Sequence, residues 1–207
     1  MTAFGEPLTG AVLAGGRGRR MDGRDKGLIP LAGRPAVEYV LERVAPQVDR
    51  ILINANRNRD AYAAYGHPVH PDRSGDYAGP LAGMATALAA AETDRILTVP
   101  CDTPWLPPDL ADRLLQVRAA AGAEIATVHD GRTSHPVIAL LDRGLLESLE
   151  AYLAEGERKI DRWYARHRLA LADYSDCPEA FTNINSPADS AAAELRLAGR
   201  GSTGDEP

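Results

Sequence analysis

Short runs of apolar and β-branched residues alternate along the chain with longer stretches whose apolar positions follow helical spacing. Within 35–48, for instance, valine or leucine stands at 37, 40, 41, 44 and 48, which together form one face of a helix. We predict strands at 10–15, 50–55, 95–100, 124–128 and 135–141. We predict helices at 35–48, 80–92, 107–122, 144–156 and 186–199, the last with Ser186 as N-cap and Asp189 in a capping-box position. This alternation predicts an α/β fold of three layers, with a mostly parallel sheet flanked by helices.

Each of the first three predicted strands leads into a polar loop. The loops read LAGG, NANRN and PCDTP. In open α/β sheets, ligands bind beyond the carboxyl ends of the strands. We therefore expect a ligand site that is built from these three loops.

Composition and charge limit the kind of protein and ligand. The 207 residues fit one domain, predicted over 1–198, with a small polar tail at 199–207 that we expect to be disordered. A net charge of −6 argues against broad nucleic-acid binding. Cys101 and Cys177 lack metal-ligand spacing, and we see neither a signal peptide nor an apolar run of the ~18–20 residues that span a membrane. We expect a cytoplasmic protein that binds neither membranes nor nucleic acids.

Basic residues gather in one glycine-rich loop. The segment LAGGRGRRMDGRDKGL (13–28) holds five basic residues and five glycines, which in an acidic protein favours a small anionic ligand. A Walker A loop is excluded because Gly18 and Gly23 are followed by Arg24 and Asp25, and the GxGxxG spacing of dinucleotide-binding loops is absent too. What remains is a strand, two glycines whose amides can approach an anion, and Lys26 to neutralise its charge.

The same loop resembles the signature of the molybdenum cofactor guanylyltransferases: LAGG, a short gap, RM, and then DKxL. Asp25 favours this branch, because relatives that act on sugar phosphates usually place proline before the lysine; Asp22, where the family often has glycine, is a departure. Four further segments are similar to family motifs in the same order: HPDRSGDYAGPLAGM (70–84), PCDTPWLP (100–107), HPVIAL (135–140) and FTNINSPAD (181–189). The resemblance thus extends over most of the chain.

The resemblance implies a Rossmann-like nucleotidyltransferase fold and a reaction. GMP passes from GTP to molybdenum-molybdopterin with Mg²⁺ as cofactor, pyrophosphate leaves, and other molybdenum cofactor biosynthesis proteins are possible partners. Asp102 is implied as the metal ligand, and Lys26 and Asp102 as catalytic residues. The implied nucleotide-binding residues are Leu13, Ala14, Gly15, Lys26, Asn54, Asp72 and Asp102.

Each of these residues also has a plain structural interpretation. Asp102 follows a strand and can cap the next turn, Lys26 can be a solvated lysine, and Asn54 and Asp72 can form turns through their side chains. Cys101 is most simply a small buried residue, since a nucleophilic thiol needs an activating partner.

The acceptor side is less defined. The resemblance associates His135 and either Asn183 or Asn185 with it, and the basic segment 156–164, with Arg158 and Lys159, is a candidate for the acceptor's phosphate or simply an exposed helix end.

The expected chemistry requires no general base, because the attacking group is already an anionic phosphate oxygen. Catalysis then consists of holding the reactants in line and neutralising charge. Three alternatives stay open: cytidylyl transfer to the same cofactor, nucleotidyl transfer to a sugar or isoprenoid phosphate, and a nucleotide-binding module without catalysis. The pair Asp25-Lys26 disfavours the second, and the presence of both Asp102 and Lys26 disfavours the third.

Overall fold

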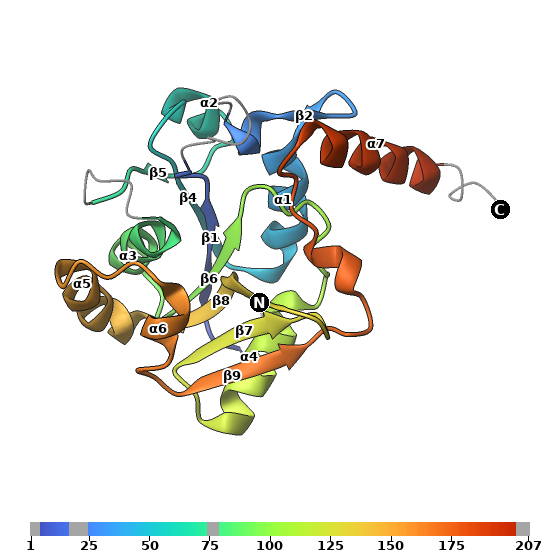
Figure 1. Cartoon of the computed structure of the whole chain (residues 1–207). Coiled ribbons are helices and arrows are strands. Elements are labelled where there is room, and N and C mark those ends of the chain that lie inside the picture. Colours follow the sequence, from blue (N-terminus) through green and yellow to red (C-terminus); the bar gives the residue numbers. More distant parts are fainter. Residues whose placement is uncertain (1–4, 17–24, 74–78, 202–207) are drawn as a thin grey trace.

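A seven-stranded sheet forms the centre of the molecule (Figure 1). The computed structural model describes residues 5–16, 25–73 and 79–201. The strand order is β5-β4-β1-β6-β8-β7-β9, and β8 is antiparallel to both of its neighbours whereas the other pairs are parallel. The strands are β1 (Leu8–Leu13), β4 (Arg50–Asn54), β5 (Val69–His70), β6 (Arg95–Pro100), β7 (Ile125–His129), β8 (Ser134–Asp142) and β9 (Leu169–Asp173).

Helices cover both faces of this sheet. On one face, α1 (Ala36–Val44) and α4 (Leu110–Ala121) share a core with the strands through side chains such as Val40 and Leu114, both fully buried. The opposite face is covered by α3 (Pro80–Ala90), α5 (Leu146–Ala154) and α6 (Ile160–Tyr164), where Leu88, Leu149 and Trp163 are fully buried. The predicted three-layer α/β fold is confirmed.

A third hydrophobic cluster, smaller than those on the two faces of the sheet, lies at the C-terminal helix. Helix α7 (Pro187–Gly201) packs near the hairpin of β2 (Pro30–Leu31) and β3 (Arg34–Pro35), and Trp105, Ile184 and Ala193 are buried there. The predicted cap of α7 forms in part: the Asp189 amide donates to Ser186 Oγ at 3.2 Å, while the Asp189 carboxylate accepts from the amide of Asn185.

All five predicted strands and all five predicted helices form; β6 has the predicted ends, and the others are shifted at one end or both. Strand β1 starts and ends two residues earlier than predicted, which leaves Ala14 and Gly15 in the loop beyond it. Helix α7 continues to Gly201, past the predicted domain boundary at 198, and residues 202–207 lie outside the described part of the chain. Strands β5 and β9, the β2–β3 hairpin, α6 and α2 (Arg59–Ala63) have no counterpart in the sequence prediction, since two to five residues carry little periodic signal.

The register of the parallel strands brings three strand ends together. Leu13 of β1 pairs with Asn54 of β4 on one side and with Pro100 of β6 on the other, and Asn54 pairs with His70 of β5. The loops that follow these strands therefore start side by side at one edge of the sheet, as the sequence predicts.

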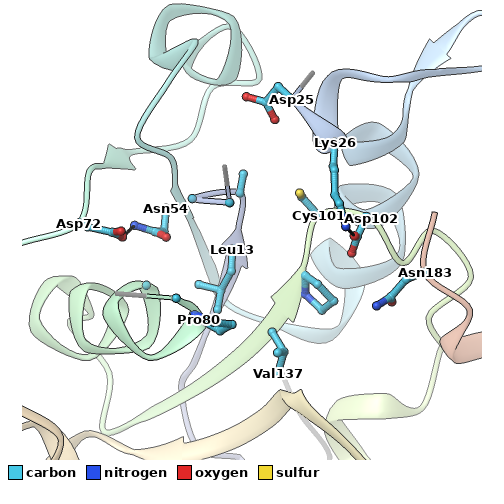
Figure 2. A pocket seen from close by; sticks show the side chains of 16 residues that line it. Leu13, Asp25, Lys26, Asn54, Asp72, Pro80, Cys101, Asp102, Val137 and Asn183 are labelled. Atoms are coloured by element: carbon cyan, nitrogen blue, oxygen red, sulfur yellow. Dashed lines mark hydrogen bonds and ion pairs between the residues drawn. The ribbon is translucent and has the colours of Figure 1, made fainter. Parts of the chain in front are cut away.

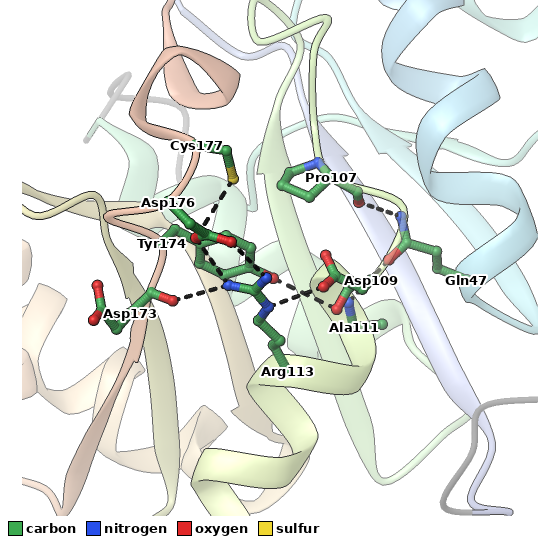
Figure 3. Close-up of polar contacts among 9 residues, drawn as sticks. All are labelled: Gln47, Pro107, Asp109, Ala111, Arg113, Asp173, Tyr174, Asp176 and Cys177. Atoms are coloured by element: carbon green, nitrogen blue, oxygen red, sulfur yellow. Dashed lines mark hydrogen bonds and ion pairs between the residues drawn. The ribbon is translucent and has the colours of Figure 1, made fainter.

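An arginine holds the chain between β9 and α7 against α4 (Figure 3). The guanidinium of Arg113 donates to both carboxylate oxygens of Asp176, at 3.1 and 2.9 Å, and to Asp109 at 2.9 Å, and it lies 4.3 Å from the centre of the Tyr174 ring. At the start of α4, the side chain of Gln47 accepts from the amide of Ala111 and donates to the carbonyl of Pro107. The Arg113 contacts thus hold the start of the segment that leads to Asn183 and Asn185 against α4.

Candidate active site

A cavity of about 290 Å³ opens where the three strand ends meet (Figure 2). Gly79 and Pro80, at the start of α3, also line it, so the N-terminus of this eleven-residue helix faces the cavity, where helix amides favour an anion. Every residue predicted to bind the nucleotide or the metal lines this cavity: Leu13, Ala14, Gly15, Lys26, Asn54, Asp72 and Asp102.

Three polar side chains form a rigid group at one end of the cavity. Asn54 Nδ2 donates to Asp72 Oδ1 at 2.9 Å, and Asn56 Nδ2 donates to Asp72 Oδ2 at 2.7 Å. The amide of Asp72 returns a hydrogen bond to Asn56 Oδ1 at 2.8 Å. Both carboxylate oxygens of Asp72 are therefore held in place, and two asparagines at the end of β4 determine how the carboxylate is oriented in the cavity.

Sequence reasoning missed Asn56. The spacing of Asn54 and Asn56 indicates that Asn56 belongs to the site, because residues two apart in an extended chain point to the same side. Asn56 also donates to the carbonyl of Gly15 at 3.2 Å and so ties the β4 loop to the glycine loop.

Two glycines let the backbone approach the Asn54 amide. A Cβ atom at Gly83 would lie 2.5 Å from Asn54 Oδ1, and one at Gly15 would lie 2.9 Å from the same oxygen. Asn54 is 1% exposed and packed from both sides, so it has no free space to move into. Both glycines are therefore needed for the conformation of this end of the cavity.

Replacing Gly83 with alanine is expected to weaken nucleotide binding about tenfold, because Asn54 must shift and Asp72 moves with it. Isothermal titration with a nucleoside triphosphate measures the change. Gly144→Ala serves as the matched control, since a Cβ there meets no atom within 4 Å. Equal affinity of the two variants would contradict the role of the Asn54 group.

Charged residues meet at the other end of the cavity. Lys26 Nζ donates to Asp102 Oδ2 at 2.9 Å and also to Asn185 Oδ1. The Asp102 side chain is 8% exposed and that of Lys26 is 27% exposed, so the carboxylate is buried and the ammonium reaches the cavity. The backbone of Asp102 is held in turn, because its carbonyl accepts from the amide of Ile184 at 2.9 Å.

The segment that carries Asn183 reaches this end of the cavity. Asn183 lines the cavity and accepts from Thr103 Oγ1 at 2.6 Å. Asn183 and Asn185 are thus both beside the Lys26–Asp102 pair, where the resemblance associates them with the acceptor.

Asp25, the residue before Lys26 in the family motif, stabilises the turn on which Lys26 lies. Its carboxylate accepts from Tyr62 OH at 2.5 Å and from Asn58 Nδ2 at 3.1 Å. Burial raises the pKa of Tyr62 well above its usual range, with help from nearby Cys101 and Asp25, so the phenol stays protonated and donates. The turn packs closely, because a Cβ at Gly27 would lie 2.5 Å from Tyr62 OH.

Cys101 is a neutral neighbour of the site. Burial, with the nearby charge of Asp102, raises the pKa of its thiol well above the usual value. The thiol is therefore protonated near neutral pH, which fits the expected absence of a cysteine nucleophile.

The other candidates, His135 and Arg158, do not line this cavity. His135 Nε2 lies 2.8 Å from Asp130 Oδ2, its ring is 5.1 Å from that of Phe181, and the hydrogen bond from His135 lowers the pKa of Asp130 below its usual range. Arg158 lines a separate cavity with Arg73 and Glu150, and its guanidinium donates to the carbonyl of Leu153. The basic residues 17–24 of the glycine loop lie outside the described residues.

The chemistry of the site suits a metal that is shared with phosphates. In the part of the chain that the structure describes, no three His, Cys, Asp or Glu side chains gather into a metal site. Of the three described carboxylates that line the cavity, those of Asp25, Asp72 and Asp102, only that of Asp102 belongs to a buried residue. Mg²⁺ keeps waters and takes phosphate oxygens, so one or two carboxylates suffice for it.

The sheet with its helix layers, and a cavity at the strand ends that holds a lysine and a carboxylate, define the class: the chain is a nucleotidyltransferase. The sequence model of the MobA-like NTP transferase domain matches residues 10–171, and the chain belongs to this family. Enzymes of this type typically use a divalent metal ion.

Relatives agree with this family over most of the chain. The molybdenum cofactor guanylyltransferase of Shewanella pealeana is 50% identical over 176 residues, which are 85% of this chain and 88% of the relative. That of Shewanella loihica is 48% identical over 180 residues, 87% of this chain and 92% of the relative. The predicted family is confirmed.

Solved structures share the fold. The crystal structure of molybdopterin-guanine dinucleotide biosynthesis protein A from Archaeoglobus fulgidus superimposes with a TM-score of 0.76 at 24% identity, covering 92% of this chain and 99% of that one. At this identity the likeness concerns the fold. Among the described residues, no helix has the length and apolar character needed to cross a bilayer.

Proposed function

We propose that the protein transfers GMP from GTP to molybdenum-molybdopterin and releases pyrophosphate. The observation that carries the proposal is one cavity with two distinct ends. The rigid Asn54–Asn56–Asp72 group suits a base or ribose, and the Lys26–Asp102 pair suits phosphates. The relatives that are about half identical to this chain bear the matching name.

The two ends have separate roles in this proposal. Leu13, Ala14 and Gly15 line the cavity between them and contact the nucleotide, while Asn54 and Asp72 bind its base or ribose. Lys26 binds the phosphates and stabilises the negative charge that develops on them during transfer. Lys26 lines the cavity, and its ammonium is held there by Asp102 and Asn185.

We propose Mg²⁺ as the divalent ion and Asp102 as its protein ligand. When bound, the ion would neutralise phosphate charge and orient the triphosphate. Lys26 is paired with Asp102 Oδ2, so Asp102 would hold the ion beside the lysine. The acceptor phosphate is itself anionic, so the chain has to bring two anions together, and the cations serve that purpose.

Base choice decides between this proposal and cytidylyl transfer on the same scaffold. The test is pyrophosphate release with molybdenum-loaded molybdopterin and either GTP or CTP, each with Mg²⁺. We expect turnover with GTP at least tenfold above that with CTP, since a site that hydrogen-bonds one base leaves polar groups unpaired with another. Preferred use of CTP would overturn the base assignment, and binding of GTP without turnover would favour the module without catalysis.

We further propose a cytoplasmic location and direct transfer of the product to other proteins of molybdenum cofactor biosynthesis. The location is supported by a chain with two free thiols. The transfer remains a proposal that co-purification with such proteins tests.

A further inference from the structure

Strand β8 leaves the regular sheet at the edge of the cavity. Its pairing with β7 jumps from Ala139, opposite Thr127, to His135, opposite Val128, so residues 136–138 have no partner on β7. Its pairing with β6 also ends at Ala139. Pro136 fits such a bulge, because it has no amide hydrogen to leave unpaired. The bulge brings Val137 into the wall of the cavity, across from Asp25 and Lys26 (Figure 2).

Three buried hydroxyl groups satisfy the carbonyls that the bulge removes from the sheet. Tyr164 OH donates to Pro136 O at 2.7 Å, and Thr98 Oγ1 donates to Val137 O at 2.8 Å. Thr127 Oγ1 lies 2.9 Å from Ile138 O and 3.1 Å from His135 O. Each of the carbonyls 136–138, whose residues have no partner on β7, thus has a hydroxyl partner.

These hydroxyls come from three separate parts of the fold. Thr98 is on β6, two residues before Pro100, Thr127 is on β7, and Tyr164 ends α6. The three residues are 0%, 1% and 3% exposed, so their hydroxyl groups have little access to water. Burial raises the pKa of Tyr164 well above its usual range, so it remains a donor. Losing the Thr127 hydroxyl leaves the buried carbonyl of Ile138 without this partner, and losing the Thr98 or Tyr164 hydroxyl removes the partner of a partly buried carbonyl. Either change favours a different path for the bulge.

We propose that Thr98, Thr127 and Tyr164 are positioning residues for catalysis, which act by holding the β8 bulge and with it Val137. This inference rests on the proposed function. Val137 lies between Pro80, on the side of the Asn54 group, and Asn183, on the side of the Lys26–Asp102 pair, and the donor and acceptor phosphates have to align between these two ends (Figure 2). A shift of this wall changes the alignment of the reactants and leaves the Asn54 group unchanged. The effect therefore falls on kcat more than on nucleotide affinity.

The experiment compares Thr98→Val and Thr127→Val with Thr9→Val. Valine keeps the shape and removes the hydroxyl. Thr9 is a matched control, because it is 2% exposed on the neighbouring strand β1 and bonds Thr93 at 2.7 Å, outside the cavity lining. Circular dichroism and thermal unfolding establish that all variants fold. Transfer rates and nucleotide dissociation constants are then measured for each.

We expect kcat to fall about tenfold in Thr98→Val and Thr127→Val, with nucleotide affinity within about twofold of the wild type. Thr98→Ser restores the hydroxyl and should recover most of the rate. Thr9→Val should keep the wild-type kcat while its melting temperature falls. If the Thr98 and Thr127 variants behave as Thr9→Val does, or if Ser fails to restore the rate, the inference is wrong.

The proposed function is tested on the wild-type enzyme and not on the variants. It is wrong if the wild-type enzyme transfers a nucleotide other than GMP. The ratio of variant to wild-type kcat is then measured with that nucleotide and still decides whether the bulge positions the reactants.

Discussion

Replacing Asp102 with asparagine is expected to lower the transfer rate by about 10³-fold while the protein keeps its fold. Asparagine has the same shape, and its Oδ1 still accepts from Lys26 Nζ, so the cavity retains its geometry. What disappears is the negative charge that would attract a divalent ion. The rate is measured as pyrophosphate release at saturating GTP and Mg²⁺.

The structural consequences of this change are small. Lys26 is 27% exposed at its side chain, so it can be hydrated when its partner loses charge. We expect a change of a few degrees at most in melting temperature, about the effect of 1 kcal/mol in a domain of this size. A transfer rate of Asp102→Asn within tenfold of the wild-type rate would contradict the role assigned to Asp102.

Asp49→Asn is the control for this experiment. Its carboxylate accepts a hydrogen bond from the backbone amide of Leu8 at 2.9 Å, at the start of β1 and away from the cavity. We expect this variant to lose some stability and to retain its rate. Similar loss of rate in both variants would indicate a general effect of removing a structural carboxylate.

The second large effect is expected for Lys26→Met, with the rate reduced by about 10²-fold. Methionine keeps much of the length of the side chain but offers no charge to the phosphates. The reduction is smaller than for Asp102→Asn because glycine-loop amides and the start of α3 also face the cavity and stabilise anions. Steady-state kinetics at varied GTP concentration measures both kcat and KM.

Lys26→Met should also lower stability, in contrast to Asp102→Asn. It leaves the carboxylate of Asp102, whose side chain is 8% exposed, without its cation, at a cost of about 1–3 kcal/mol. Added Mg²⁺ should then raise the melting temperature of this variant more than that of the wild type, since an ion that binds the folded state stabilises it. The absence of any Mg²⁺ effect on the variant would argue against a metal at Asp102.

Arg50→Met is the control for Lys26→Met, because it also replaces a cationic side chain with methionine. Arg50 pairs with Glu92 at 3.1 Å, and both side chains are more than half exposed. Such surface pairs contribute little, so we expect neither the rate nor the stability to change by more than a small amount. A rate loss like that of Lys26→Met would show that net charge, and not position, matters.

The class and the location of the site follow from local patterns. Helical and strand spacing predicts the five major strands and helices, and parallel strands bring their carboxyl ends to one edge. Leu13, Asn54 and Asp102 each stand at or directly after a strand end, so their common location is predictable without long-range contacts. The family motifs, such as DK at 25–26, add the chemistry.

The contacts that orient those residues depend on folding. Asn185 reaches Lys26 from a distance of 159 positions in the sequence, and Tyr62 bonds Asp25 across 37 positions. No local periodicity encodes such pairs, because they depend on how separate elements pack. The same holds for the β8 bulge, whose three hydroxyl partners come from β6, β7 and α6.

From its residues alone, this chain is recognisable as an α/β nucleotidyltransferase with an anion site after β1, because strand periodicity and short motifs are local properties. Packing alone settles that Asp72 is held by two asparagines, that Asp25 is a support for the turn of Lys26, and that Val137 enters the cavity. The physical reason is that these arrangements are fixed by buried hydrogen bonds between distant segments. Such bonds become obligatory only once folding has removed water from their donors and acceptors.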